Sequence, residues 1–108
     1  MIKMIEIVTR KAGTTHAEFA RYWYEMHAPL VCKIVPGVER YIQNHPLKRK
    51  SGKDPRVDGI VEIWLDSLES WNDFYFSDKG KKLRDDEAQF VDMKKSFALL
   101  VDERAIIP

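Results

Sequence analysis

The segment GIVEIWL, residues 59–65, restricts more than any other part of the sequence how the chain can fold. Its β-branched and aromatic residues predict a strand, and successive side chains of a strand point to opposite faces of the sheet. Ile60 and Trp64 therefore face one way, and three apolar residues face the other (Val61, Ile63 and Leu65). An open sheet with one solvated face would alternate apolar and polar residues, so this strand requires cover on both faces.

Three more segments predict strands. Residues 97–102 repeat the two-sided pattern, with an apolar residue at every position from Phe97 to Val101. Residues 2–9 are short and rich in β-branched residues, and residues 38–43 alternate as a half-buried strand after a Pro-Gly turn. The chain therefore supplies four strands.

Two amphipathic helices separate these strands. Thr15 and Glu18 form a capping box, in which each side chain accepts a hydrogen bond from the other residue's backbone N–H, and a helix begins there. Its apolar face follows the spacing of one helix side (Phe19, Tyr22, Trp23, Met26 and Leu30). Asp66 or Ser67 caps the second helix, whose apolar face carries Leu68, Trp71, Phe74 and Tyr75. The charged stretch at residues 77–95 holds a further short helix and a turn.

The predicted order is β-α-β-β-α-β, the arrangement of ferredoxin-like folds. We expect an α+β protein, with helices on one face of a four-stranded antiparallel sheet, and one domain over residues 1–108. Helices on one face leave the other bare, so we expect a homodimer whose two sheets meet. The alternative cover is the polar loop at residues 47–58 with the C-terminal tail, although both are poor in apolar residues.

Composition argues against several classes of function. Eighteen basic and 17 acidic residues leave a net charge of +1, which does not favour nucleic acid, and the basic loop at residues 48–56 lacks interleaved aromatic residues. The single cysteine, Cys32, excludes an internal disulfide framework and suits the reducing cytoplasm. Charges interrupt the apolar N-terminal segment, unlike a signal peptide, and no apolar run approaches the ~18 residues of a membrane span. We expect neither a metal ion nor an organic cofactor, because the histidines lack paired spacing and no glycine loop would cradle a phosphate.

His27 is the first candidate for chemistry. It shares a helix face with Phe19 and Trp23, and Pro29 follows two residues later. Proline lacks an N–H and disfavours helical geometry in the preceding residue, so we expect the helix to end or kink at His27 and to place the ring at the rim of the core. By spacing alone, the more common alternative is a core histidine that is hydrogen-bonded to a carbonyl or carboxylate.

Two glutamates interrupt the strands. Glu6 shares a face with Met4 and Val8, and Glu62 is central in its strand. The first and third strands are neighbours in a ferredoxin-like sheet, so the two carboxylates could lie close together and raise each other's pKa. Glu62 is the stronger candidate, and the alternative is an ion pair with a nearby cation.

Three other groups have simpler interpretations. We expect His16, in the first helical turn, to face solvent. His45 follows a strand and is expected to cap a loop, and Cys32 is expected to pack without a partner that would activate it.

Taken together, these segments resemble the EthD-like family of the dimeric α+β barrel superfamily. The marks are HAEFARYWYEMHAPLV (16–31), PGVERYIQNH (36–45), DGIVEIW (58–64) and DEAQFVD (86–92). The resemblance implies a homodimer whose sheets close into a barrel, and a cleft with His27 at its edge. It also implies a role in the breakdown of ethers or aromatic compounds, or cofactor-free isomerase, decarboxylase or cyclase chemistry.

The leading hypothesis is therefore a cofactor-free enzyme for a small, hydrophobic, oxygenated molecule. His27 would move a proton and Glu62 would orient it, while Tyr41 and Asp86 would position the substrate. Four aromatic residues would line the pocket (Trp23, Tyr41, Trp64 and Phe90), although they are equally suited to a plain core. The alternatives are a non-catalytic dimeric binding protein and a cofactor-independent quinol monooxygenase.

Overall fold

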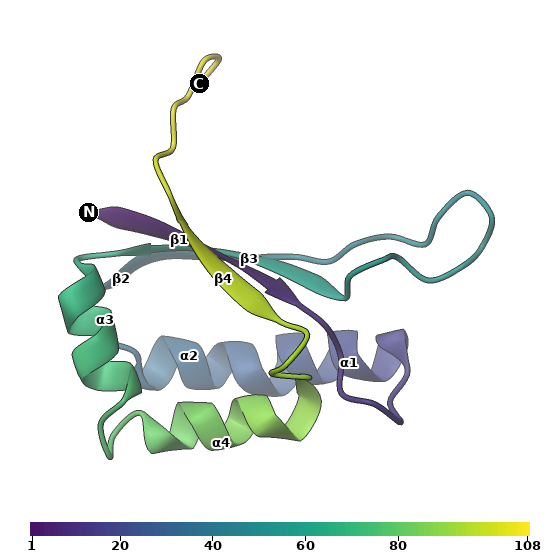
Figure 1. Ribbon diagram of the computed structural model, residues 1–108, viewed down its shortest axis with the longest axis horizontal. Helices are drawn as coiled ribbons and strands as arrows, with labels where there is room; N and C mark the ends of the chain where they lie inside the picture. Colours follow the sequence, from purple (N-terminus) through teal and green to yellow (C-terminus); the bar gives the residue numbers. More distant parts are fainter.

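The computed structural model describes residues 1–108 and contains one four-stranded sheet (Figure 1). Its strands are β1 (Ile2–Val8), β2 (Val38–Asn44), β3 (Gly59–Leu65) and β4 (Phe97–Val101). They are ordered β2-β3-β1-β4, and each neighbouring pair is antiparallel. The predicted strands are confirmed, with ends that differ by at most one residue.

The helices lie on one side of this sheet (Figure 1). α1 (His16–Tyr22), the π-helical turn η1 (Trp23–His27) and α2 (Ala28–Ile34) follow one another without a break and form one rod. α3 (Leu68–Tyr75) and α4 (Lys81–Phe90) complete the layer. The protein is therefore α+β, and its element order and sheet match the predicted ferredoxin-like arrangement.

Local signals in the sequence set where the helices begin. Oγ1 of Thr15 accepts from the backbone N–H of Glu18 at 3.1 Å, and Oε1 of Glu18 accepts from that of Thr15 at 2.9 Å, so the capping box is confirmed. Oγ of Ser67 accepts from the backbone N–H of Ser70 at 3.1 Å, so Ser67 rather than Asp66 caps α3. A cap of this kind contributes about 1 kcal/mol to helix stability.

The prediction that the first helix ends or kinks at His27 is wrong. Ala28 has helical dihedral angles (φ −58°, ψ −46°), and the rod continues to Ile34. In a regular α-helix the ring of Pro29 would clash with the carbonyl four residues earlier. Here the N–H of Ala28 bonds to the carbonyl of Trp23, five residues earlier, and this wider π-turn accommodates the proline.

The core lies between the sheet and the helices. Val61, Ile63 and Leu65 of β3 point into it and are buried, as their alternation predicts. Trp23 is only 1% exposed and packs above Gly59, where an added Cβ would lie 2.7 Å from the indole ring. Each fully buried side chain of this size contributes about 1.5–3 kcal/mol, so this layer stabilises the fold substantially.

The opposite face of the sheet, called the outer face below, carries the alternate residues of the same strands. Ile5 of β1 lies beside Leu99 of β4 and Glu62 of β3, in register. Leu99 is 51% exposed and Phe97 56% exposed, so the predicted two-sided apolar pattern leaves an uncovered apolar surface. Glu103 contacts Lys3 and Trp64 on this face, at 2.8 Å and 3.2 Å, but the rest of the exposed tail extends away from the sheet (Figure 1) and leaves Phe97 and Leu99 uncovered.

Candidate functional site

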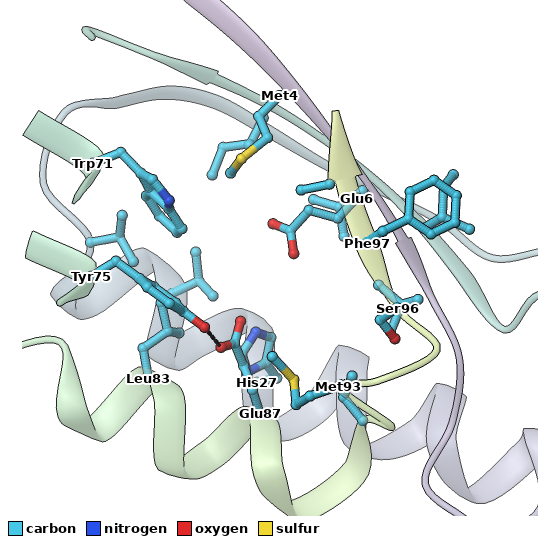
Figure 2. Close-up of a pocket in the computed structure, with 18 of the residues that line it drawn as sticks. Met4, Glu6, His27, Trp71, Tyr75, Leu83, Glu87, Met93, Ser96 and Phe97 are labelled. Atoms are coloured by element: carbon cyan, nitrogen blue, oxygen red, sulfur yellow. Dashed lines mark hydrogen bonds between the residues drawn. The ribbon is translucent and has the colours of Figure 1, made fainter. Parts of the chain in front are cut away.

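A cavity of about 290 Å³ lies between the sheet and the helices. Most of its lining is apolar, and residues come from all four strands and from every helical segment except α1. Five side chains with titratable groups also reach it, from three helical segments and from β1 and β2: Glu6, His27, Tyr41, Tyr75 and Glu87 (all but Tyr41 are labelled in Figure 2). The site therefore combines an apolar lining with groups that can exchange protons.

His27 is held in this lining by a carboxylate behind it. Its Nδ1 lies 2.7 Å from Oδ2 of Asp86, on α4, and the hydroxyl of Tyr22 donates to the other oxygen of Asp86 at 2.5 Å. Asp86 therefore fixes the Nδ1–H tautomer of the ring. Nε2 has no hydrogen-bond partner in the protein and is not sealed from solvent, so its lone pair is available in the cavity.

Burial decides the charge of this ring. The His27 side chain is 8% exposed, and desolvation lowers its pKa below the ordinary value of 6.5, although the hydrogen bond to Asp86 opposes that shift. The imidazole is therefore neutral near pH 7. A neutral ring with one nitrogen held by a carboxylate and the other free has the arrangement of a general base.

Two carboxyl groups face the same cavity from opposite sides. Glu6 points in from β1 and makes no hydrogen bond or ion pair, whereas Oε1 of Glu87, on α4, accepts from the hydroxyl of Tyr75 at 2.5 Å (Figure 2). Burial, and then the Glu87 charge, raise the pKa of Glu6 to about 7. Burial also raises the pKa of Glu87 to about 7, even though the Tyr75 bond works against it.

Glu62 is placed away from this site, which corrects the prediction that it partners His27 and lies near Glu6. Glu62 pairs in register with Ile5, whereas Glu6 pairs with Val61, so the two carboxylates point to opposite faces. Oε2 of Glu62 lies 2.8 Å from Nζ of Lys3, and this hydrogen bond lowers its pKa. Glu62 thus follows the ion-pair alternative.

Trp64 shares the outer face with Glu62 and does not line the cavity, contrary to the prediction. Its ring lies under Nζ of Lys3, 4.4 Å from the ring centroid, and under the guanidinium of Arg40 at 4.9 Å. Its indole N–H donates to Glu103 at 3.2 Å. The alternation along the strand correctly predicted that Ile60 and Trp64 share a face of the sheet. That face, however, is the one without helices.

The other predicted site residues lie at or behind the cavity. Tyr41 and Phe90 line it, and Trp23 lines it from within the core. Phe90 packs against His27, with ring centroids 5.0 Å apart and ring planes tilted by 55°. Desolvation raises the pKa of Tyr41 to about 12, so its hydroxyl stays protonated. Asp86 contacts His27 rather than the cavity, and so positions the ring.

Neither Glu87 nor Tyr75 was predicted as a site residue. Leu83, Glu87 and Phe90 follow helical spacing and share the inward side of α4, which was the available signal. It was obscured because the helix lies in a stretch rich in both charges, which resembles a solvated surface. Glu6 had the correct signal, since it lies between the buried residues Met4 and Val8.

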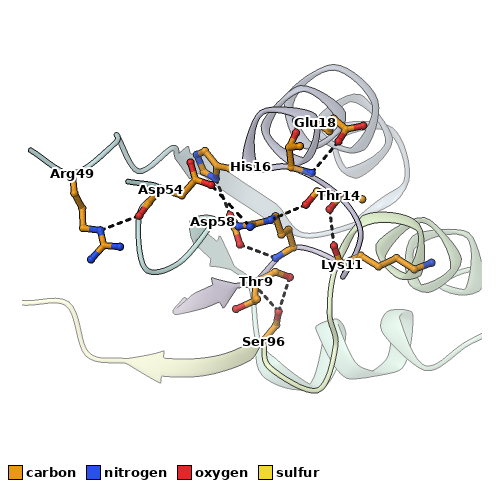
Figure 3. A network of polar contacts seen from close by, with 11 residues as sticks. Thr9, Lys11, Thr14, His16, Glu18, Arg49, Asp54, Asp58 and Ser96 are labelled. Carbon is orange, nitrogen blue, oxygen red and sulfur yellow. Dashed lines mark hydrogen bonds and ion pairs between the residues drawn. The ribbon is translucent and has the colours of Figure 1, made fainter. Parts of the chain in front are cut away.

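His16 does not face solvent, contrary to the prediction. Its Nδ1 lies 2.8 Å from Oδ1 of Asp58, and the same oxygen accepts from the guanidinium of Arg10 at 3.0 Å (Figure 3). Burial raises the pKa of Asp58, but the hydrogen bonds from Arg10 and His16 outweigh it and lower the pKa overall. This cluster ties β1, α1 and the start of β3 together and is distant from His27 in the fold.

His45 and Cys32 are the remaining candidates. His45 lies in the loop after β2, as predicted, where Nε2 contacts Oε1 of Gln43 at 2.8 Å and the ring packs at a tilt against Trp23. Cys32 is exposed, so the prediction that it packs is wrong. No three His, Cys, Asp or Glu side chains are grouped as metal ligands would be. None of the helices has the length and apolar character that a membrane span requires.

The sheet order, the one-sided helical layer and the cavity define a protein of the ferredoxin-like α+β class. A family model described as the EthD domain matches residues 11–94. The protein therefore belongs to the EthD family. No curated protein matches the sequence.

Solved structures share this fold over nearly the whole chain. An EthD family protein from Bacillus halodurans C-125 matches with a TM-score of 0.71 and 21% identity, over 96% of this chain and 100% of that one. A hydroxynitrile lyase from Passiflora edulis matches with a TM-score of 0.68 and 12% identity, over 99% and 96%. A dimeric protein with a ferredoxin-like fold from Bacteroides fragilis NCTC 9343 matches with a TM-score of 0.67 and 8% identity, over 94% and 95%. At these identities the likeness shows the fold alone.

Proposed function

We propose that the protein is an enzyme that transfers a proton to or from a small, uncharged, hydrophobic molecule, with His27 as its general base. The observation that carries this proposal is the Nδ1–Asp86 contact of 2.7 Å, with Nε2 free beside an apolar cavity. A well-placed base contributes roughly 10²–10⁴-fold to a rate. The remainder would come from holding the substrate in a water-poor site.

The chemistry follows from the two ring nitrogens. Nε2 would accept a proton from a C–H or O–H group of the substrate, and the resulting imidazolium would be stabilised by the carboxylate of Asp86. The same ring would then return the proton to another atom. This sequence suits an isomerase, a lyase or a cyclase, and the likeness to a hydroxynitrile lyase is in keeping with it.

The lining indicates what kind of molecule the cavity would accept. Trp71, Tyr75 and Phe90 supply flat apolar surfaces, and Trp71 and Tyr75 stack at 5.2 Å. No lysine or arginine lines the cavity, so nothing there would neutralise an anionic substrate. An uncharged molecule with an aromatic or alicyclic body is the best match. Activity in the cytoplasm, in the catabolism of such compounds, stays a prediction.

The test uses two probes with the purified protein. Mandelonitrile reports cyanohydrin cleavage through benzaldehyde release, and 2-tetralone reports enolisation through deuterium uptake from D₂O. We expect the wild-type protein to accelerate at least one reaction, and His27→Ala to lower that rate about 10²-fold or more. His45→Ala is the matched control, because this imidazole lies outside the cavity.

Two outcomes would count against the proposal. Full activity in His27→Ala would remove the ring from the mechanism. Saturable binding of both probes without turnover would instead indicate the binding protein considered above.

We further propose that two copies of the chain form a homodimer through their outer faces. Leu99 and Phe97 leave an exposed apolar surface there, which the tail does not cover although Glu103 contacts Lys3 and Trp64 beside it. Surfaces of this kind are rare on monomers. The relative from Bacteroides fragilis is described as dimeric, which supports this assembly. Sedimentation velocity of the wild-type protein tests this assembly. A monomer across a wide concentration range would contradict it.

A further inference from the structure

The general base leaves one feature of the cavity unexplained, namely the two carboxyl groups in an otherwise apolar wall. Resting on the proposed function, we infer that Glu6 is protonated and donates a hydrogen bond to the oxygen of a bound ligand. The cavity would therefore be a site for uncharged carbonyl compounds. Glu6 would be the acid and His27 the base of one proton-transfer pair.

The position of Glu6 is the first argument. It lies on the central strand β1, between Met4 and Val8, which are 5% and 6% exposed, and its carboxyl group points into the cavity (Figure 2). It has no hydrogen-bond or ion-pair partner in the protein, and its oxygens are open to solvent rather than sealed in the core. A carboxyl group that is open to an apolar cavity and has no partner is free to bond to a ligand there.

The groups around Glu6 are the second argument. The titratable side chains that face it are His27 from η1, Tyr41 from β2, Tyr75 from α3 and Glu87 from α4. None of them is a cation at neutral pH, because burial lowers the pKa of His27 and the other side chains have no cationic form; the raised pKa of each tyrosine keeps its hydroxyl neutral. No positive charge therefore favours an ionised Glu6.

Glu87 and Glu6 differ in how each would hold a proton. Glu87 accepts a hydrogen bond from Tyr75, which favours its carboxylate form, and Arg84 also acts in that direction. Glu6 has no such donor. Because two buried carboxylates in one cavity repel each other, the pair keeps a proton near neutral pH, and Glu6 is the better place for it.

A protonated carboxyl group selects its ligand. It donates to a carbonyl oxygen, whereas an anionic ligand would meet the negative charge of Glu87 without a cation in compensation. On an enolisable ketone, Nε2 of His27 would take the proton from the carbon next to the carbonyl. The electron pair of that C–H bond would form the C=C bond of the enol, and the C=O π pair would take the proton from Glu6. The products are an imidazolium and a carboxylate, and the reverse transfers restore both groups.

Binding of 2-tetralone and of tetralin, which lacks the oxygen, isolates this hydrogen bond. We expect the affinity for 2-tetralone to fall about tenfold between about pH 6 and about pH 8.5, and the affinity for tetralin to stay unchanged. In Glu6→Gln the amide still donates and has no charge, so the affinity for 2-tetralone should become independent of pH. Glu62→Gln is the matched control on the outer face and should behave as the wild type.

The contrary results are equally specific. An unaltered pH dependence in Glu6→Gln, the same dependence with tetralin, or failure of 2-tetralone to bind would overturn the inference. Deuterium uptake that is abolished in His27→Ala but unaffected in Glu6→Gln would contradict it and leave the proposed base intact. A rate unaffected in His27→Ala would contradict the proposed function instead.

Discussion

Nδ1 of His27 lies 2.7 Å from Oδ2 of Asp86, a contact that joins the π-turn η1 to helix α4 across 59 positions of sequence. The two residues of this contact come from separate elements, so the orientation of the His27 ring depends on how the helices pack. The hydroxyl of Tyr22, one turn earlier on the same rod, occupies the second oxygen of Asp86. The ring, the carboxylate and the phenol therefore form one positioned unit.

Asp86→Asn should lower activity about 10²-fold or more while the protein stays folded. The amide cannot stabilise the imidazolium, and loss of the carboxylate should move the pKa of His27 further down. Nitrogen-15 NMR of the imidazole measures that pKa and the tautomer. Tyr22→Phe keeps the carboxylate and should have a smaller effect, so a larger loss in Tyr22→Phe than in Asp86→Asn would contradict this assignment.

Glu6→Gln should stabilise the protein at high pH. The pKa of Glu6 is raised from 4.5 to about 7 in the folded state, so the folded protein binds more protons than the unfolded chain between these values. The wild-type free energy of unfolding therefore falls as pH rises through this window. The variant lacks this loss and should gain on the order of 1–3 kcal/mol above pH ~7, with no gain below pH ~4.5.

Urea unfolding across this pH range measures the change in the free energy of unfolding. For Glu62→Gln we expect a change of the opposite sign. The pKa of Glu62 is lowered by Lys3, so its stabilisation is present above its ordinary pKa and is lost as pH falls. Glu62→Gln should therefore destabilise the protein at neutral pH. Equal pH profiles for the two variants would show that Glu6 is solvated in the folded state.

Gly59→Ala should destabilise the protein by about 1–3 kcal/mol, because the new Cβ would lie 2.7 Å from the ring of Trp23, which is buried and packed against His45. Gly13→Ala is the comparison: it has open space around it but a φ of +86°, which costs about 1–2 kcal/mol for a residue with a Cβ. Near-ultraviolet circular dichroism should change only in Gly59→Ala. An unchanged tryptophan signal there would contradict the close packing.

Leu99→Glu should dissociate the proposed dimer, because it would bury a charge between the two outer faces without a partner. We expect sedimentation velocity to show a monomer at concentrations where the wild type is dimeric, with unchanged far-ultraviolet circular dichroism. Leu47→Glu is the control, since Leu47 is 85% exposed in the loop before β3. Dissociation by both substitutions, or by neither, would place the interface elsewhere.

The strands and helix starts could be predicted because their signals are local. A period of two in residues 59–65 and a capping box at Thr15 act over a few residues, and the structure confirms both. Local rules failed at Pro29, where an i−5 hydrogen bond from Ala28 to Trp23 lets the helix continue. The packing of the rod on the sheet outweighs the cost of that irregular turn.

Which residues share a strand face or a helix face could be deduced from their spacing along the chain, and four short motifs were sufficient to indicate the EthD family. The spacing did not determine which face meets the helices, and so it favoured Glu62 over Glu6. The contact of Asp86 with His27, and the approach of Glu6 and Glu87 to one cavity, became evident from the packing of the elements. Periodicity fixes directions within one element, whereas distances and desolvation between elements depend on how they pack.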